Sequence, residues 1–224
     1  MNTERTTAVV LRRTNYGEAD RILQLLTPNG QRSVMARGVR KEKSRLAGGI
    51  ELFATSDVVI AKGKGGLGIL TSARMRHFYR HILDDYDRMQ FAYEVTELAA
   101  KASESVDEAH WYGILVEVYA GLDAITVPLQ LIQVWFYLQY AEVTGYGLNL
   151  ERDINGEPLE ASQRYSYDNS ERGLRRAENG DITADCIKLL RIINAKSIGV
   201  VAQIGGVEAV LADCWLIARQ HAAV

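Results

Sequence analysis

The sequence predicts an α+β protein with two domains, a small closed β-barrel followed by an α-helical domain. Within residues 1–76, short apolar stretches alternate with turn residues, and no helical period interrupts them. From residue 78 onward, apolar side chains recur at the spacing of amphipathic helices. The charge divides in the same way, because residues 1–81 hold 15 Lys and Arg against 6 Asp and Glu, whereas residues 82–224 hold 11 against 22. We therefore expect the barrel to bind a polyanion and the acidic helical domain to have a different role.

The expected barrel has five short strands. The stretches that predict them are residues 7–13, 21–26, 32–36, 50–62 and 67–74. Turn residues at 15–17 and at Pro28-Asn-Gly30 predict reversals between the first three strands. So few strands usually avoid exposed edges by closing, and the five-stranded solution is the OB-fold, which often binds nucleic acids.

The rest of the chain predicts five helices and one irregular insertion. Apolar residues repeat at helical spacing over 91–102, 111–125, 129–138, 186–193 and 207–217. Pro128 is suited to the start of the third helix, and Thr183 to the N-cap of the fourth. Residues 146–182 are polar and lack a sustained period. We therefore expect an OB-fold domain over residues 1–80 and a helical domain over residues 81–224, with residues 146–182 as an irregular polar insertion.

Two cysteines, Cys186 and Cys214, are too few for a disulfide framework or a metal knuckle. No apolar stretch reaches signal-peptide or membrane-span length. The protein is therefore expected in the cytoplasm, without a membrane partner.

The densest basic run in the chain follows the third expected strand. Its five cations are Arg37, Arg40, Lys41, Lys43 and Arg45, and only Glu42 opposes them. Most short charge runs are solvated loops without a ligand, but the basic character of the whole N-terminal part favours a site for phosphodiesters. Aromatic residues are few in this part of the chain, so we expect charge rather than base stacking to dominate the affinity.

The motifs that could indicate an enzyme are weak. Residues 63–68 match G-x-G-x-x-G, but a strand rather than a helix is expected after them, so a glycine-rich hairpin turn is favoured over a nucleotide pocket. His77 and His81 have the spacing of a metal site but lack a third ligand and a general base. The aromatic residues 135–140 are more typical of a helix core than of a ligand cage. No catalytic constellation is found, and we expect a binding protein rather than an enzyme.

Several motifs, in order and at compatible spacing, resemble the RecO family of bacterial DNA repair proteins. They are Asn15-Tyr-Gly-Glu-Ala-Asp-Arg-Ile-Leu23 with the following Leu-Leu-Thr-Pro, Ala36-Arg-Gly-Val-Arg40 with Lys-Ser-Arg-Leu46, and the glycine hairpin after a long strand. The resemblance is weaker over the helical half. It implies a DNA-binding recombination mediator, associated with the nucleoid, that binds single- and double-stranded DNA and anneals complementary strands. It also implies that RecR is a partner in loading RecA onto DNA coated by single-strand binding protein, whose C-terminal tail is a further partner.

The resemblance assigns the five cations of the basic run to DNA binding. Charge and expected position in the barrel add Arg12, Arg13, Lys62, Lys64, Arg74 and Arg76. Many members of the family carry a four-cysteine zinc site in the insertion, whereas this chain has only Cys186 in that region, with Asp153, Asn155 and Tyr167 among the positions where ligands would be expected. One thiol cannot form a structural zinc site, so no zinc or other cofactor is expected. An OB-fold adaptor for an acidic protein and an RNA-binding translation accessory remain the alternatives.

Overall fold

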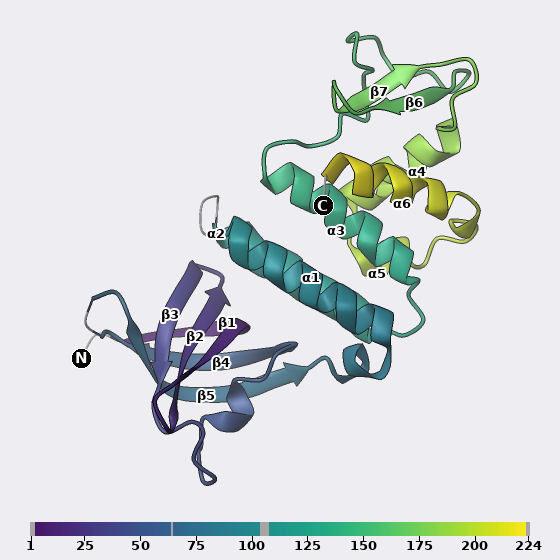
Figure 1. Cartoon of the computed structure of the whole chain (residues 1–224). Coiled ribbons are helices and arrows are strands. Elements are labelled where there is room, and N and C mark those ends of the chain that lie inside the picture. Colours follow the sequence, from purple (N-terminus) through teal and green to yellow (C-terminus); the bar gives the residue numbers. More distant parts are fainter. Residues whose placement is uncertain (1–2, 64, 104–107, 223–224) are drawn as a thin grey trace. The chain divides into compact units, whose positions relative to one another are not determined.

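The computed structural model describes residues 3–63, 65–103 and 108–222 (Figure 1). The chain forms two compact units, residues 1–123 and residues 124–224. None of the helices in the described ranges is both long and apolar enough to cross a membrane.

The first unit begins with a closed barrel of five strands. They are β1 (Thr3–Tyr16), β2 (Asp20–Thr27), β3 (Gly30–Ala36), β4 (Ala54–Ala61) and β5 (Gly68–Phe78), in the order β1-β2-β3-β5-β4. Neighbouring strands are antiparallel except at the seam between β3 and β5, where Val34 pairs with Gly68 and Met35 with Ile69 in parallel. The pairing of β1 with β4 closes the barrel. The predicted α+β class and five-stranded barrel are confirmed.

The barrel core follows the alternation of the strands. Side chains at every second position point inward, and the buried cluster includes Ala8, Val10, Leu23, Leu25, Val34, Ala36, Val58, Ile60 and Leu70. Turn chemistry fixes the first hairpins, since Gly17 and Gly30 adopt positive φ angles of 57° and 95°. Thr27 supports the second turn by donating its hydroxyl to the Gly30 carbonyl at 2.8 Å.

The predicted strand over residues 50–62 is wrong at its beginning. Residues 47–49 form a short 3-10 helix, η1 (Ala47–Gly49), and β4 starts only at Ala54. Phe53 has a φ of 55°, which breaks extended pairing and directs its ring into a buried aromatic cluster. Gly49 is required where the chain passes β5, because a Cβ there would lie 2.5 Å from the Ala73 backbone.

Two helices complete the first unit and pack against β1, β2 and β3. After the 3-10 turn η2 (Arg80–Asp84), α1 spans Tyr86–Ala102 and α2 spans Glu108–Asp123. The Asp85 side chain caps α1 by accepting from the Arg88 N–H at 3.0 Å. Phe53 joins the barrel to both helices, because its ring makes edge contacts with Tyr93 at 4.9 Å and Tyr119 at 5.6 Å. The chain passes from barrel to helices near residue 80, after β5 ends at Phe78. A domain limit between residues 80 and 81 stays a prediction.

The described part of the second unit, residues 124–222, contains four helices: α3 (Leu129–Val143), α4 (Ala184–Ala195), the short α5 (Ile198–Val201) and α6 (Glu208–Ala222). Helix α3 is apolar on nearly all sides and packs against α4, α5 and α6. The predicted cap of α4 is confirmed, since the Thr183 side chain accepts from the Cys186 N–H at 3.3 Å.

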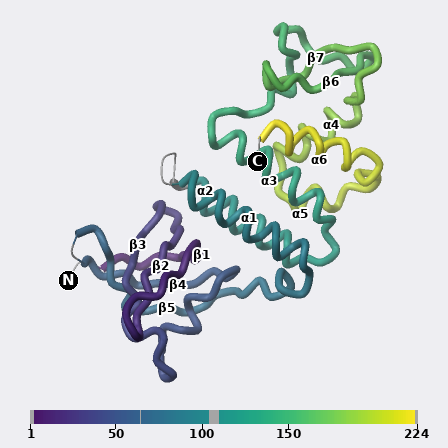
Figure 2. Tube along the Cα trace, viewed as in Figure 1, coloured from purple at the N-terminus to yellow at the C-terminus, as the bar shows by residue number. Residues whose placement is uncertain are grey.

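The insertion between α3 and α4 contains a structure that the sequence did not predict (Figure 2). Strands β6 (Tyr165–Asp168) and β7 (Gly173–Arg176) form a two-stranded antiparallel sheet. Tyr165, 2% exposed, ties the sheet to the chain before α4 through two backbone hydrogen bonds with Ile182. The insertion is therefore an ordered subdomain of the second unit.

Candidate nucleic-acid interface

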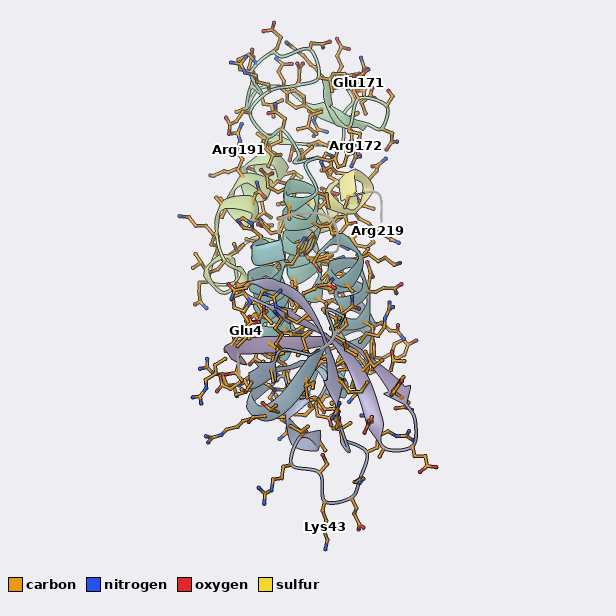
Figure 3. All side chains as sticks on the ribbon, turned by 90° about the vertical axis from the view of Figure 1, so that its left-hand side faces the viewer. Glu4, Lys43, Glu171, Arg172, Arg191 and Arg219 are labelled. Carbon is orange, nitrogen blue, oxygen red and sulfur yellow. The ribbon has the colours of Figure 1, made fainter. Side chains whose placement is uncertain are left out.

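The basic loop, defined here as residues 37–46, leaves the end of β3 and leads into η1. Its five cations, Arg37, Arg40, Lys41, Lys43 and Arg45, are all exposed. Figure 3 shows Lys43 at the tip of the loop, pointing into solvent. Within the part of the chain that the structure describes, no ion pair links any of the five to a carboxylate. Their charges are therefore available to an external anion.

The topology of the barrel explains why a loop is needed here. Strands β3 and β4 follow each other in sequence but are not neighbours in the barrel, so the chain must cross one end of it. Gly38, with a φ of 63°, allows the turn that starts this crossing. Such a connection has no strand partner, and its side chains can carry charge without disturbing the core.

The foot of the loop is attached to the turn between β1 and β2. The Gly38 N–H donates to the Asp20 carboxylate at 2.6 Å, and the Arg40 N–H donates to the Ala19 carbonyl at 2.9 Å. The Arg40 guanidinium also donates to the Gly17 carbonyl at 3.2 Å. These three bonds hold the beginning of the loop in place while Lys41, Lys43 and Arg45 extend beyond it.

The six further cations predicted from charge alone differ in their surroundings. Arg13 forms an ion pair with Glu51 at 2.9 Å, and Arg76 forms one with Asp57 at 2.8 Å. Arg12 lies close enough to Glu97 that its charge, after the larger effect of the Lys101 hydrogen bond and charge, helps to lower the pKa of that carboxyl. Among the described members, Arg12, Lys62, Arg74 and Arg76 are exposed and Arg13 is half-buried, whereas Lys64 lies outside the described residues. Within the described residues, Arg12, Lys62 and Arg74 are therefore the members that are exposed and have no ion pair with a carboxylate.

Lys62 lines a depression beside the parallel seam of the barrel. The depression has a volume of about 500 Å³. Among the residues that line it are Thr3, Glu4, Arg32, Val34, Lys62 and Gly66. Arg32 is paired with Glu4 at 3.2 Å, so Lys62 is the cation there that remains without an ion pair among the described residues. Strand β5 begins at Gly68, directly after the glycine-rich turn, and the helix N-terminus of a dinucleotide site is therefore not formed there.

The two histidines that the sequence singled out meet at one carboxylate. His81 Nδ1 lies 3.1 Å and His77 Nε2 3.5 Å from the Asp123 side chain, which also accepts from the His81 N–H at 2.9 Å. The contact fixes η2 to the last residue of α2. No group of three or more His, Cys, Asp or Glu arranged to hold a metal ion occurs within residues 3–63, 65–103 and 108–222.

The insertion does not fit a structural zinc ion. The Asp153 carboxylate accepts from the backbone N–H groups of Asn155 and Glu157 at 2.8 and 3.0 Å, and so closes its loop by itself. Cys186 points away from this loop, with its Sγ 3.3 Å from that of Cys214 on α6, and both residues are buried. The Tyr167 hydroxyl lies 2.9 Å from His221 Nδ1, so the positions that could have supplied ligands offer at most one thiol and have other contacts.

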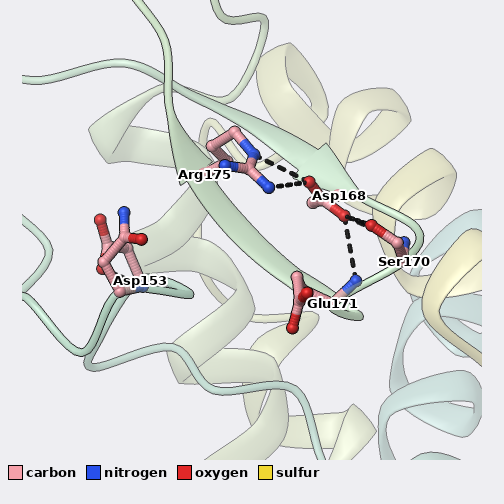
Figure 4. A network of polar contacts seen from close by, with 6 residues as sticks. Asp153, Asp168, Ser170, Glu171 and Arg175 are labelled. Atoms are coloured by element: carbon pink, nitrogen blue, oxygen red, sulfur yellow. Dashed lines mark hydrogen bonds and ion pairs between the residues drawn. The ribbon is translucent and has the colours of Figure 1, made fainter.

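A second carboxylate closes the β6–β7 hairpin (Figure 4). Asp168 accepts from the Ser170 hydroxyl at 2.6 Å, from the Glu171 N–H at 3.0 Å, and from the Arg175 guanidinium through two bonds of 2.8 and 2.6 Å. These three donors, in that order of effect, hold the pKa of Asp168 well below its usual range. Hydrogen bonds to this charged carboxylate therefore stabilise the turn of the hairpin.

The chain is similar in sequence to a known protein family. Residues 1–79 match the family model described as "Recombination protein O N terminal". A DNA repair protein RecO of Dehalococcoides mccartyi is 32% identical over 204 residues, covering 87% of this chain and 79% of the relative. One of Heliobacterium modesticaldum is 33% identical over 162 residues, covering 71% of this chain and 58% of the relative. One of Roseiflexus sp. is 37% identical over 121 residues, covering 54% of this chain and 42% of the relative.

Proposed function

Because the chain belongs to the RecO family of DNA repair and recombination proteins, we propose that it is a non-enzymatic recombination mediator. It binds single- and double-stranded DNA through phosphates, anneals complementary strands, and acts with RecR to load RecA onto DNA coated by single-strand binding protein. The C-terminal tail of that protein is a further partner. The observation that carries the proposal is the basic loop, in which five exposed cations lack carboxylate partners in the described structure.

The charges of the loop suit a phosphodiester ligand better than a protein one. The cations are on a loop whose foot is fixed and whose tip is exposed, so they can follow a flexible backbone without reading its bases. Each phosphate that they neutralise releases condensed counterions, and affinity should therefore fall steeply with salt. An acidic protein partner could bind the same charges, but a protein that binds only such a partner would not anneal complementary DNA strands.

The experiment is charge reversal in the loop. A variant with Arg40, Lys41 and Lys43 each changed to Glu should bind a labelled single strand at least roughly tenfold more weakly in fluorescence anisotropy at low salt. The matched control changes Arg176, Lys188 and Lys196, three exposed cations of the second unit, to Glu. This control has the same net charge, so it separates a local site from a general effect of charge.

Equal affinity of the loop variant and the wild-type protein at matched salt would remove the basic loop from the DNA site. Annealing of complementary strands, measured with the same proteins, then tests the activity itself. Tighter binding of RNA than of DNA, without annealing, would support the translation accessory, and no binding of either would support the protein adaptor.

A further inference from the structure

Tyr16, the last residue of β1, presents its aromatic ring to solvent beside the basic loop. The residue is 55% exposed. A single exposed ring on a protein surface needs no explanation by itself. The position of this ring beside the cations is informative, and it follows from the strand register.

The register places Tyr16 on the face where the loop begins. Tyr16 pairs with Asp20 across the β1–β2 hairpin, and residues directly opposite in an antiparallel pair project on the same face. The Asp20 carboxylate on that face accepts from the Gly38 N–H at 2.6 Å. The peptide that joins Arg37 to Gly38 therefore lies on the same side of the hairpin as the Tyr16 ring.

Arg40 adds a second link between the ring and the loop. Its backbone donates to the carbonyl of Ala19, and its guanidinium donates to the carbonyl of Gly17, the residue after Tyr16. The turn that carries Tyr16 and the loop that carries the charges thus form one continuous surface. The Asp20 carboxylate is held at the foot of the loop by the Gly38 N–H.

We propose that Tyr16 is a base-stacking residue, which receives one unpaired base of a DNA strand whose phosphates are bound by the basic loop. The inference rests on the proposed function and deepens it by naming unpaired DNA as the class of ligand that this part of the surface distinguishes. Every base has a π-face, so a single ring is tolerant of sequence. In a duplex both faces of each base are already stacked, and Tyr16 can then contribute only through its edge or its hydroxyl.

The two parts of the surface have separate roles. The cations provide most of the affinity for either form of DNA and all of its dependence on salt. Tyr16 provides discrimination, because stacking is a short-range contact that exists only with an accessible base. A mediator that anneals strands needs such a distinction, since it must hold an unpaired strand and release the product duplex.

The test compares Tyr16→Ala, Tyr16→Phe and the wild-type protein by anisotropy on a single strand and on a duplex of the same length, at several salt concentrations. Loss of one stacked base predicts roughly 5- to 150-fold weaker binding of the single strand by Tyr16→Ala. Binding of the duplex should be unchanged, and so should the slope of affinity against salt. Tyr16→Phe keeps the ring and should bind the single strand as the wild-type protein does.

The control is Tyr86→Ala on α1, which removes another exposed tyrosine, 68% exposed, from the same unit. It should leave both affinities unchanged. If Tyr16→Ala binds the single strand as tightly as the wild-type protein, or loses both substrates equally, the stacking role is overturned while the mediator proposal stands. If the wild-type protein binds neither substrate at low salt, the proposed function itself fails.

Discussion

His221, near the end of α6, is a buried histidine whose two nitrogens have assigned partners. It is 2% exposed, with Nε2 2.5 Å from the Tyr146 carbonyl and Nδ1 2.9 Å from the Tyr167 hydroxyl. A carbonyl can only accept, so Nε2 carries the proton and Nδ1 accepts from Tyr167. Burial, together with the nearby Arg172 charge and against the effect of the Tyr146 carbonyl, lowers the pKa of His221 below its ordinary value.

This lowered pKa makes the stability of the second unit dependent on pH. The unfolded chain binds a proton at His221 more readily than the folded chain, so stability is full above the unfolded pKa of about 6.5 and is lost as pH falls below it. We expect the midpoint of thermal unfolding to decrease between pH 7.5 and pH 5.5. In His221→Gln that decrease should be smaller, although loss of a buried hydrogen bond costs about 1–2 kcal/mol at pH 7.5. Parallel pH curves for the two proteins would show that His221 does not titrate in this range.

The candidate site shows which residues a sequence can reveal. Five cations close together in the chain are exposed in the structure as expected, because consecutive charges cannot all be buried. The ion-pair partners of Arg13 and Arg76 could not be predicted from the sequence, because Glu51 and Asp57 are distant in the chain and come close to them only when the protein folds. The stacking role proposed for Tyr16 could not be read from the sequence either, because it depends on strand register.

At the scale of elements, the hairpin of the insertion is held by hydrogen bonds to a charged carboxylate. The β6–β7 hairpin is short, and its turn depends on what Asp168 accepts from Ser170, Glu171 and Arg175 (Figure 4). Because the pKa of Asp168 is lowered, its contribution is complete above the unfolded pKa of about 3.9 and is lost as pH falls toward the folded value.

A variant Asp168→Asn should therefore loosen the hairpin at neutral pH. Hydrogen exchange of the amides in residues 165–176 should be faster than in the wild-type protein, with the amides of the barrel unchanged. A metal chelator should have no effect on this exchange in either protein. Slower exchange after metal addition, or faster exchange after chelation, would show that the insertion binds a metal after all.

The sequence predicted those elements that depend on residues close together in the chain. Turn residues defined the first hairpins, and the 3.6-residue period with the Thr183 cap defined the long helices. The segment before β4 was misread because Phe53 is buried in an aromatic cluster rather than in a strand. The β6–β7 hairpin was missed because side-chain bonds to the backbone stabilise it, and these leave no apolar period.

At the scale of the whole molecule, positive charge is concentrated in the N-terminal part although the net charge is −2. Binding to DNA is therefore expected to depend on the positive electrostatic field of the N-terminal part and not on the net charge of the whole chain. If each of the five loop cations contacts one phosphate of a single strand, the logarithm of affinity should change with the logarithm of salt with a slope of about −3.5.

The loop variant with Arg40, Lys41 and Lys43 changed to Glu should reduce that slope to about −1.4, because two of the five contacts remain. The control with Arg176, Lys188 and Lys196 changed to Glu should keep the slope of the wild-type protein. Identical slopes for the loop variant and the wild-type protein would mean that the cations act elsewhere than at the phosphates.

The pairing of β1 with β4, which closes the barrel, also determines how long one edge of β1 stays unpaired during synthesis. Strand β1 leaves the ribosome before β4, and residues 3–9 of β1 pair with β4, as in Thr3 with Ala61. At about 5–20 residues per second, that edge remains open for a few seconds after β1 has been made. The unpaired edge over residues 3–9 is a surface on which nascent chains can associate. Glu4 and Arg5 lie on the part of β1 that pairs with β4, and charged residues on a strand edge disfavour such association.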